Sequence, residues 1–374
     1  MRRVVFHLRR SAFVKLCVAF MVFVSLCVSS WSVSASEVKS APLFVIQQKG
    51  KYGFIDKSGK IKIKPQFSYA EDFSEGRALI EQKFGDSMKS GFIDVTGKIV
   101  VKPVYDHAIT FHEGLAAVFT FENGKMTSHY IDAYGKVVID LNGGISFGFN
   151  EGVALLYQES INDLSKNSKY GFIDKKGNVV IEPQYEGVPV SIPGAFQEGL
   201  TPVRLEGKYG YINKSGQLVI AYQFGDATLF KEGLAAVEDD QGRWGYIDKT
   251  GRYVIKPKFQ SAVEFNEGLA AVLLDKNKWG FIDKKGKLVI PAKYESVEEF
   301  HEGLAPVNFG SDENEQWGYI DKKGKTVIKP QFGSVEPFMN GLARVTIEQY
   351  KIGASNPPFG YINAQGKFVW KPSL

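Results

Sequence analysis

The stretch Trp244-Gly245-Tyr246-Ile247-Asp248-Lys249-Thr250-Gly251-Arg252-Tyr253-Val254-Ile255-Lys256-Pro257 decides the fold. Aromatic and β-branched residues on both sides of an Asp-Lys-Thr-Gly string predict two strands joined by a tight turn. The Asp side chain can hydrogen-bond the turn backbone, and the glycine supplies the positive φ. The proline removes a ladder donor, so we expect the second strand to stop there.

This stretch recurs nine times. The glycine of the aromatic-Gly-aromatic-Ile-Asp string, or the residue in its place, returns after 38, 38, 42, 39, 35, 35, 38 and 42 residues. Tandem repeats of this length are typical of solenoids, propellers and arrays. The repeat signature consists of Gly53, Gly91, Gly171, Gly210, Trp244, Gly245, Trp279, Gly280, Trp317, Gly318 and Gly360.

Each unit also contains a Gly-Leu-Ala-Ala-Val string, as in Gly268–Val272, which predicts a first strand before the hairpin. Both faces of that strand are apolar, so neighbouring units must stack to bury them. We therefore predict an all-β chain of nine three-stranded antiparallel units.

For the arrangement of the units we favour an open β-superhelix over a closed propeller-like ring. Nine units exceed the usual limit of about eight blades, and a propeller blade normally has four strands. Leu43-Phe44-Val45 fills strand one of the first unit, so no unit is split between the chain ends. The closed ring stays open as the alternative, because neither end carries the polar capping unit that an open array needs.

The first 35 residues have the layout of a secretory signal. A basic start precedes the 13-residue apolar run Leu16–Val28, and Val33-Ser34-Ala35 resembles a cleavage site. We predict a signal peptide over 1–35, a short linker over 36–42 and the repeat array over 43–374. The alternative is an uncleaved membrane anchor. Either way the chain is exported, to the extracellular space or the cell envelope.

Charge and cysteine content narrow the function classes. The chain has 46 Lys and Arg against 41 Asp and Glu, and five of the basic residues lie in the leader. The mature part is therefore formally neutral, and we expect no nucleic-acid partner. Both cysteines, Cys17 and Cys27, lie in the leader, so the mature chain has no thiol chemistry.

The repeated strings resemble the bacterial WG repeat family, named for its Trp-Gly pair. The resemblance covers residues 43 to 374 and implies an all-β repeat protein, often exported, with no catalytic residues to transfer. The third unit departs from the pattern, because Ser128-His129 replaces the Trp-Gly pair and Leu141 replaces the proline. We expect that unit to be distorted.

The recurring polar residues favour structural roles, and we predict no cofactor and no metal. One Asp per unit opens the same turn, and Asn213 and Asn363 substitute for it without a change in spacing. The Glu of each Glu-Gly pair meets a near-identical environment in every unit, unlike a catalytic carboxylate pair. His112 and His301 share one slot before that pair, which we expect to face solvent.

The loops between strands one and two vary in length. They span residues 81–90, 119–128, 157–169, 308–316 and 346–358, and all share one position in the repeat. Inserts on one edge of a repeat array often form a binding face, although neutral drift would give the same pattern. The candidate contact residues at these tips are Phe84, Phe121, Tyr157, Phe309 and Tyr350.

These observations favour an exported, non-enzymatic interaction or scaffold protein that binds an unidentified protein or glycan at the cell surface. A carbohydrate-binding lectin is one alternative, which would use the aromatic tips. A secreted cell-wall- or glycan-active enzyme is another, and it would need a convergent, non-repeating set of polar residues. Contact with a membrane is expected only through an uncleaved leader, and the oligomeric state is open.

Overall fold

The computed structural model describes residues 41–122, 125–141, 144–158, 169–187, 196–274, 277–310, 316–347 and 358–371. All regular elements in these ranges are strands, and none of these residues forms a helix able to cross a bilayer. The predicted leader and most of the linker lie outside the described residues. The predicted all-β repeat is confirmed: the described strands form nine separate antiparallel sheets, one for each unit.

The strands of the first five units have the following bounds. Unit 1 holds β1 (Leu43–Gln48), β2 (Lys51–Asp56) and β3 (Ile61–Phe67). Unit 2 holds β4 (Tyr69–Ala70), β5 (Arg77–Phe84), β6 (Ser87–Asp94) and β7 (Ile99–Tyr105). Unit 3 holds β8 (His107–Ala108), β9 (Leu115–Glu122), β10 (Lys125–Asp132) and β11 (Val137–Asp140). Unit 4 holds β12 (Ile145–Ser146), β13 (Val153–Gln158), β14 (Lys169–Asp174) and β15 (Val179–Tyr185). Unit 5 holds β16 (Leu200–Leu205), β17 (Lys208–Asn213) and β18 (Leu218–Phe224).

The remaining four units complete the array. Unit 6 holds β19 (Ala235–Glu238), β20 (Trp244–Ile247) and β21 (Tyr253–Phe259). Unit 7 holds β22 (Ser261–Ala262), β23 (Leu269–Leu274), β24 (Lys278–Asp283) and β25 (Leu288–Tyr294). Unit 8 holds β26 (Leu304–Asn308), β27 (Trp317–Asp321) and β28 (Thr326–Phe332). Unit 9 holds β29 (Ser334–Val335), β30 (Leu342–Thr346), β31 (Phe359–Asn363) and β32 (Phe368–Trp370).

The prediction of three strands per unit was wrong for most units. In five sheets a two-residue inner strand pairs with strand one, as Ser261–Ala262 does with Leu273 and Val272. In units 5, 6 and 8 a single bridge takes its place, for example Ala227 with Val237. A strand of two residues is too short to show an alternation of apolar and polar residues, so the sequence did not predict the inner strand.

The proline does not end strand three. In unit 6, β21 runs past Pro257 to Phe259, because a bulge on β21 opposite Gly245 accommodates the residue without an amide hydrogen. A Cβ on Gly245 would lie 2.6 Å from the carbonyl oxygen of Ile255 and 2.7 Å from the nitrogen of Pro257. The signature glycine is therefore required by close backbone approach rather than by a positive φ.

Unit 3 shows what happens without that glycine, and the predicted distortion is present. Its strand three, β11, has four residues instead of seven and ends at Asp140. His129 stands at the glycine position, and its Cβ excludes the bulge that the other units form there. The pairing of β10 with β11 shifts register only between Tyr130 and Ile131.

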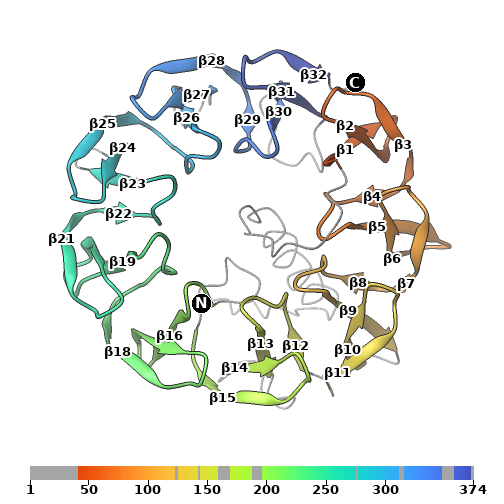
Figure 1. The fold of residues 1–374 in the computed structure, drawn as a ribbon, viewed down its shortest axis with the longest axis horizontal. Coiled ribbons are helices and arrows are strands. Elements are labelled where there is room, and N and C mark those ends of the chain that lie inside the picture. The colour runs from red at the N-terminus through yellow and green to blue at the C-terminus, as the bar shows by residue number, and fades with distance from the viewer. Residues whose placement is uncertain are drawn as a thin grey trace, which may run out of the picture.

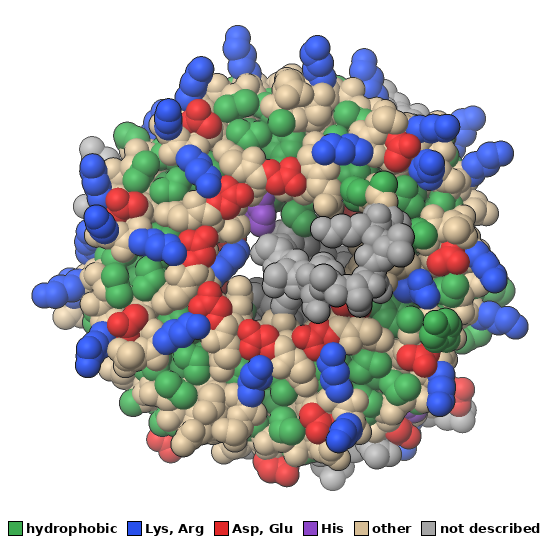
Figure 2. All heavy atoms as spheres, in the orientation of Figure 1, with side chains coloured by type: hydrophobic (Ala, Val, Ile, Leu, Met, Phe, Trp, Pro, Cys, Tyr) green, Lys and Arg blue, Asp and Glu red, His purple; other side chains and the backbone are tan. Residues whose placement is uncertain are grey.

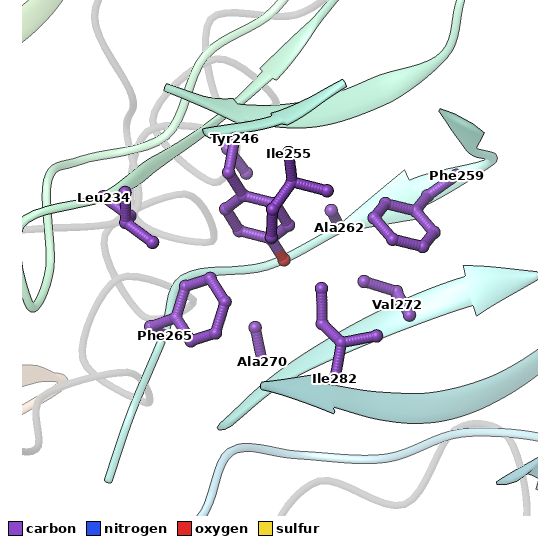
Figure 3. Packing of buried hydrophobic residues seen from close by; sticks show 10 residues of the cluster. Leu234, Tyr246, Ile255, Phe259, Ala262, Phe265, Ala270, Val272 and Ile282 are labelled. Carbon is purple, nitrogen blue, oxygen red and sulfur yellow. The ribbon is translucent and has the colours of Figure 1, made fainter. Parts of the chain in front are cut away.

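The hydrophobic core lies between neighbouring units. Figure 3 shows one cluster, in which Tyr246, Ile255 and Phe259 of unit 6 face side chains of unit 7. Phe265 of unit 7 lies against Tyr246, with ring centroids 4.8 Å apart, and both residues are fully buried. Each sheet thus buries its faces against the sheets before and after it, as the two-sided apolar pattern predicts.

The nine sheets are arranged around a common centre, with the third strands on the outside and the inner loops pointing inward (Figure 1). Unit 9 lies beside unit 1, and we refer to their contact as the seam. Phe44 of β1 packs on Tyr361 of β31, with ring centroids 5.4 Å apart. A closed ring requires such a contact between the last unit and the first.

Candidate functional site

The aspartates that open the turns accept hydrogen bonds from the turn backbone. Asp56 accepts hydrogen bonds from the amides of Ser58 and Lys60 at 2.9 and 3.1 Å. The Ser58 hydroxyl, together with these amides, lowers the pKa of Asp56. Asn213 accepts the same two bonds, from Ser215 and Gln217. Within the described residues no group of three His, Cys, Asp or Glu side chains is arranged to hold a metal ion.

The glutamates of the Glu-Gly pairs link consecutive units. Glu232 of unit 6 accepts a hydrogen bond from the Gly268 amide of unit 7 at 3.1 Å, and Lys284 of unit 7 lies 3.1 Å from the same carboxylate. The same contact to the next unit's glycine joins units 2 to 9 through Glu75, Glu113, Glu151, Glu198, Glu232, Glu267 and Glu302. This contact gives the glutamate series a structural role in the repeat.

The slot before the Glu-Gly pair is not exposed, contrary to expectation. His112 and His301 are 6% and 9% exposed, and Asn150 is 3% exposed. The slot side chains lie between neighbouring inner loops: Ser74 of unit 2 donates to the Phe111 carbonyl of unit 3 at 2.6 Å. Sequence variability at this slot resembled that of a surface position, but the slot is buried by the adjacent unit.

In units 6 to 8 the slot residues form a charged cluster. Lys231 of unit 6 forms an ion pair with Glu299 of unit 8 at 2.8 Å. Between them, Asn266 of unit 7 donates to Glu299 at 3.1 Å and lies 3.1 Å from His301 Nε2. Three units therefore converge on one carboxylate. Burial lowers the pKa of His301, which keeps the imidazole neutral at pH 7.

Further carboxylates continue this cluster toward unit 9. Burial, followed by the charges of Glu336 and Glu299, raises the pKa of Glu298 to about 7. Burial and the charge of Glu299 also raise the pKa of Glu264. These residues occupy inner-loop positions that hold apolar or small residues in units 3 to 5, such as Ile109 and Gly148. They form the convergent, non-repeating polar set that sequence reasoning missed.

Arg344 anchors the end of that set at the seam. It replaces the second alanine of the Leu-Ala-Ala-Val string, and its guanidinium contacts Asp72 at 2.6 Å and Glu336 at 3.2 Å. It also donates to the Tyr361 hydroxyl and lies over the Phe359 ring at 4.8 Å. The second Asp72 oxygen accepts the Val45 amide of β1 at 3.0 Å. Asp72 thereby joins units 1, 2 and 9.

The predicted hairpin tips differ in exposure. Phe84 and Phe121, at the ends of β5 and β9, are 55% and 42% exposed. Tyr157 instead packs on Tyr170, and Phe309 packs on Tyr294, with ring centroids 5.3 and 5.5 Å apart. Tyr350 lies outside the described residues. Phe309 nevertheless stays 37% exposed, so the exposed aromatic tips among the described residues are Phe84, Phe121 and Phe309.

An apolar groove lies beside the tip of unit 2. Phe84 and Ile99 contribute to it with Val104, which is 54% exposed. Gln82, Lys89, Lys102 and Pro103 complete the lining. Lys89 is held by Asp106 at 2.6 Å. The groove thus combines an exposed apolar floor with positively charged margins.

Comparison with known proteins places these features in a family. The WG containing repeat model matches residues 52–83, 91–125, 170–209, 209–241, 244–278, 279–311 and 317–350. The chain belongs to the WG repeat family. The model leaves out the region of the distorted Ser128-His129 string. No curated protein matches this WG repeat protein in sequence.

Solved structures resemble the WG repeat protein in fold. The crystal structure of a eukaryotic initiation factor matches with a TM-score of 0.54 at 11% identity, over 76% of this chain and 84% of that one. BamB from Moraxella catarrhalis matches with a TM-score of 0.43 at 12% identity, over 81% of this chain and 92% of that one. At such identities the likeness concerns the fold alone.

Proposed function

We propose that this WG repeat protein is an exported, non-enzymatic interaction protein of the cell envelope or extracellular space. Its binding surface for a protein partner is the pair of long hairpins in units 2 and 3. The observation that carries this proposal is the exposure of Phe84 and Phe121 on adjacent hairpins. Solvent-exposed aromatic side chains of this kind are enriched at protein interfaces, where they supply large contact area.

The groove beside Phe84 strengthens the assignment. Phe84, Ile99 and Val104 are each at least 40% exposed and line one depression together. Phe309 of unit 8 is an exposed aromatic tip as well, but it does not line this groove. An apolar side chain of a partner would be buried in this groove, and acidic groups beside it would meet Lys102.

A pull-down from envelope extracts tests this surface. The variant Phe84→Ser/Phe121→Ser should lose a partner that the unaltered protein retains. Tyr134→Ser is the matched control, because Tyr134 is 83% exposed but lies at the opposite end of β10 from the tip. If the control loses the partner and the double variant keeps it, the hairpins are not the binding surface.

We infer, as part of the same proposal, that the array is a closed ring in solution. The packing of Phe44 on Tyr361 and the ion pair of Arg344 with Asp72 support closure. Small-angle scattering should then give the radius of gyration of a compact particle of this chain length. An elongated particle would contradict closure and support the open superhelix.

Export rests on the leader. Intact mass of the protein recovered outside the cytoplasm should correspond to a chain that begins at Ser36. A mass that retains residues 1–35 would favour the uncleaved anchor. A glycan array on the same material tests the lectin alternative. Selective glycan binding that the Phe84→Ser/Phe121→Ser variant loses would make the ligand of the hairpins a glycan and not a protein.

The inner-loop carboxylates are the observation that favours an enzyme as a second candidate. A carboxyl group whose pKa is raised to about 7, as that of Glu298 is, is suited to general-acid chemistry on a glycan. The release of reducing ends from cell-wall glycans tests this candidate. Activity that Glu298→Gln abolishes would make the chain an enzyme and displace the interaction proposal.

A further inference from the structure

The outer hairpins divide the ring into two halves of different charge. Each outer hairpin runs from the turn Asp or Asn through strand three. In units 6, 7, 8, 9 and 1 these hairpins carry net charges of +3, +3, +3, +2 and +3. Their residues are 248–259, 283–294, 321–332, 363–371 and 56–67. In units 2 to 5 the corresponding charges are +1, −1, 0 and +1, over 94–105, 132–141, 174–185 and 213–224.

The five basic hairpins are contiguous in space, because the seam joins unit 9 to unit 1. Along the chain they are separated, with unit 1 at one end and units 6 to 9 at the other, so a scan along the sequence does not show them as one patch. In Figure 2, Lys and Arg side chains project from the left, upper and right margins of the molecule, whereas the lower margin carries acidic side chains.

One repeat position shows the asymmetry clearly. The residue after the inward-facing Ile, Val or Trp of strand three is exposed in every unit. On the basic half it is Lys64, Lys256, Lys329 or Lys371, all exposed, with Pro291 in unit 7. On the other half, unit 2 also holds an exposed lysine, Lys102, but units 3 to 5 hold Asp140, Glu182 and Ala221, which are exposed as well.

Protection of sheet edges does not account for this distribution. Lysine on an edge strand discourages pairing with other chains, and strand three is the outer edge of every unit. Edge protection would therefore place lysine evenly around the ring. Units 3 to 5 have the same edges with net charges of only −1, 0 and +1, so the basic half has a further cause.

We propose that the outer hairpins of units 6, 7, 8, 9 and 1 bind a linear polyanion, a flexible polymer with regularly spaced phosphate groups. The basic surface is convex and extends over five units. A flat bilayer would contact only part of such a surface, whereas a flexible chain can follow all of it. Exposed apolar side chains such as Tyr253 and Leu288 lie among the lysines and would pack against the polymer backbone.

Binding of long-chain inorganic polyphosphate to the full chain tests the proposal. The rim variant is Lys64→Gln/Lys256→Gln/Lys329→Gln, and the control variant is Lys98→Gln/Lys136→Gln/Lys176→Gln in units 2 to 4. All six lysines are exposed, so neither variant opens the core. Both variants keep the basic leader, which therefore cannot cause a difference between them.

We expect the unaltered chain to bind polyphosphate, with an affinity that falls steeply as salt rises. The rim variant should bind about tenfold more weakly at low salt, and the control variant should stay within about twofold of the unaltered chain. An equal loss in both variants, or no binding at low salt, would overturn the proposal. Vesicles of phosphatidylglycerol and phosphatidylcholine form the second arm. Tighter, rim-dependent binding to them would assign this surface to a membrane instead.

Discussion

The junction between units 6 and 7 and the seam between units 9 and 1 are joined in different ways. At the interior junction, the turn residue Gly286 packs on Ile255, and Glu232 accepts the Gly268 amide. Every residue involved belongs to the repeat pattern. At the seam, Gly59 packs on the backbone of Val369, and Asn340 stands where the other units have glutamate.

The seam keeps the repeated apolar packing, as between Phe44 and Tyr361, but its ion pairs are made by residues found once in the chain. Arg344 forms ion pairs with Asp72 and Glu336. Among the described residues no inner strand pairs with β1, and Asp72 accepts a hydrogen bond from the Val45 amide of β1. The comparison teaches that consensus residues suffice to stack one unit on the next. At the seam, specific substitutions such as Arg344 add ion pairs to that packing. The predictions that follow perturb one side of this comparison at a time.

The largest effect is expected in an interior core. Phe281 is 1% exposed and packs on Phe300 with ring centroids 4.9 Å apart, so Phe281→Ala should cost about 3–5 kcal/mol of unfolding free energy. Trp279 on the same strand is only half-buried, and Trp279→Ala should cost about half as much. Denaturant melts of the two variants give the comparison. Equal losses would mean that the first aromatic of the signature is as much a core residue as the second.

At the seam, Arg344→Met should cost about 1–3 kcal/mol, because it leaves Glu336 without its cation in a partly buried site. The exposure of Asp72 limits the loss, since its side chain is 53% exposed. We also expect a larger radius of gyration in small-angle scattering. Arg204→Met, an exposed arginine in unit 5, is the control and should change neither quantity. A compact Arg344→Met protein of unchanged stability would show that apolar packing alone holds the seam.

The inner-loop carboxylates of units 7 to 9 predict a pH dependence. The pKa of Glu298 is 4.5 in the unfolded chain, and burial raises it to about 7 in the folded protein. The folded state therefore binds more protons between these values, and stability falls as pH rises through this window. Glu298→Gln should stabilise the protein at pH 8 by about 1–2 kcal/mol and leave it nearly unchanged at pH 4. Thermal melts across this range measure the effect. A Glu298→Gln protein that loses stability at pH 8 would mean that the carboxylate is held by a favourable contact.

The sequence predicted what repeats. The period, the turns and the two-sided apolar strands each follow from a local pattern that occurs in every unit, as in Trp244–Pro257. Averaging over copies separates such a pattern from chance. The tight approach of strand three over Gly245 was visible only as a glycine that recurs in every unit but the third, because a contact between backbones requires no particular partner side chain.

What the sequence did not predict depends on residues that meet across units. Lys231 and Glu299 are 68 positions apart, and Arg344 and Asp72 are 272 positions apart. The sequence around each residue gives no sign of its partner. The buried slot of His301 was misjudged for the same reason, since its cover comes from a neighbouring unit. The packing of the units on one another decides which of these residues are neighbours, and the repeat pattern is the same for an open and a closed array.

The smallest effect should come from restoring the repeat pattern at the seam. Asn340 occupies a left-handed conformation with a φ of 54°, and the seven glutamates of the Glu-Gly pairs adopt φ values of 50 to 55°. Asn340→Glu is therefore compatible with the backbone. Lys57 of unit 1 lies against Gly341, as Lys284 lies against the Glu232 turn at the interior junction.

The new carboxylate should pair with Lys57 and stabilise the protein by a few tenths of a kcal/mol, roughly the value of an exposed ion pair. Asn340→Gln controls for side-chain length without charge. Melts at low salt and in 1 M salt separate the contributions, because screening removes a surface ion pair at high ionic strength. A gain that persists in 1 M salt, or that Asn340→Gln reproduces, would show that Lys57 does not take the role at the seam that Lys284 has inside the array.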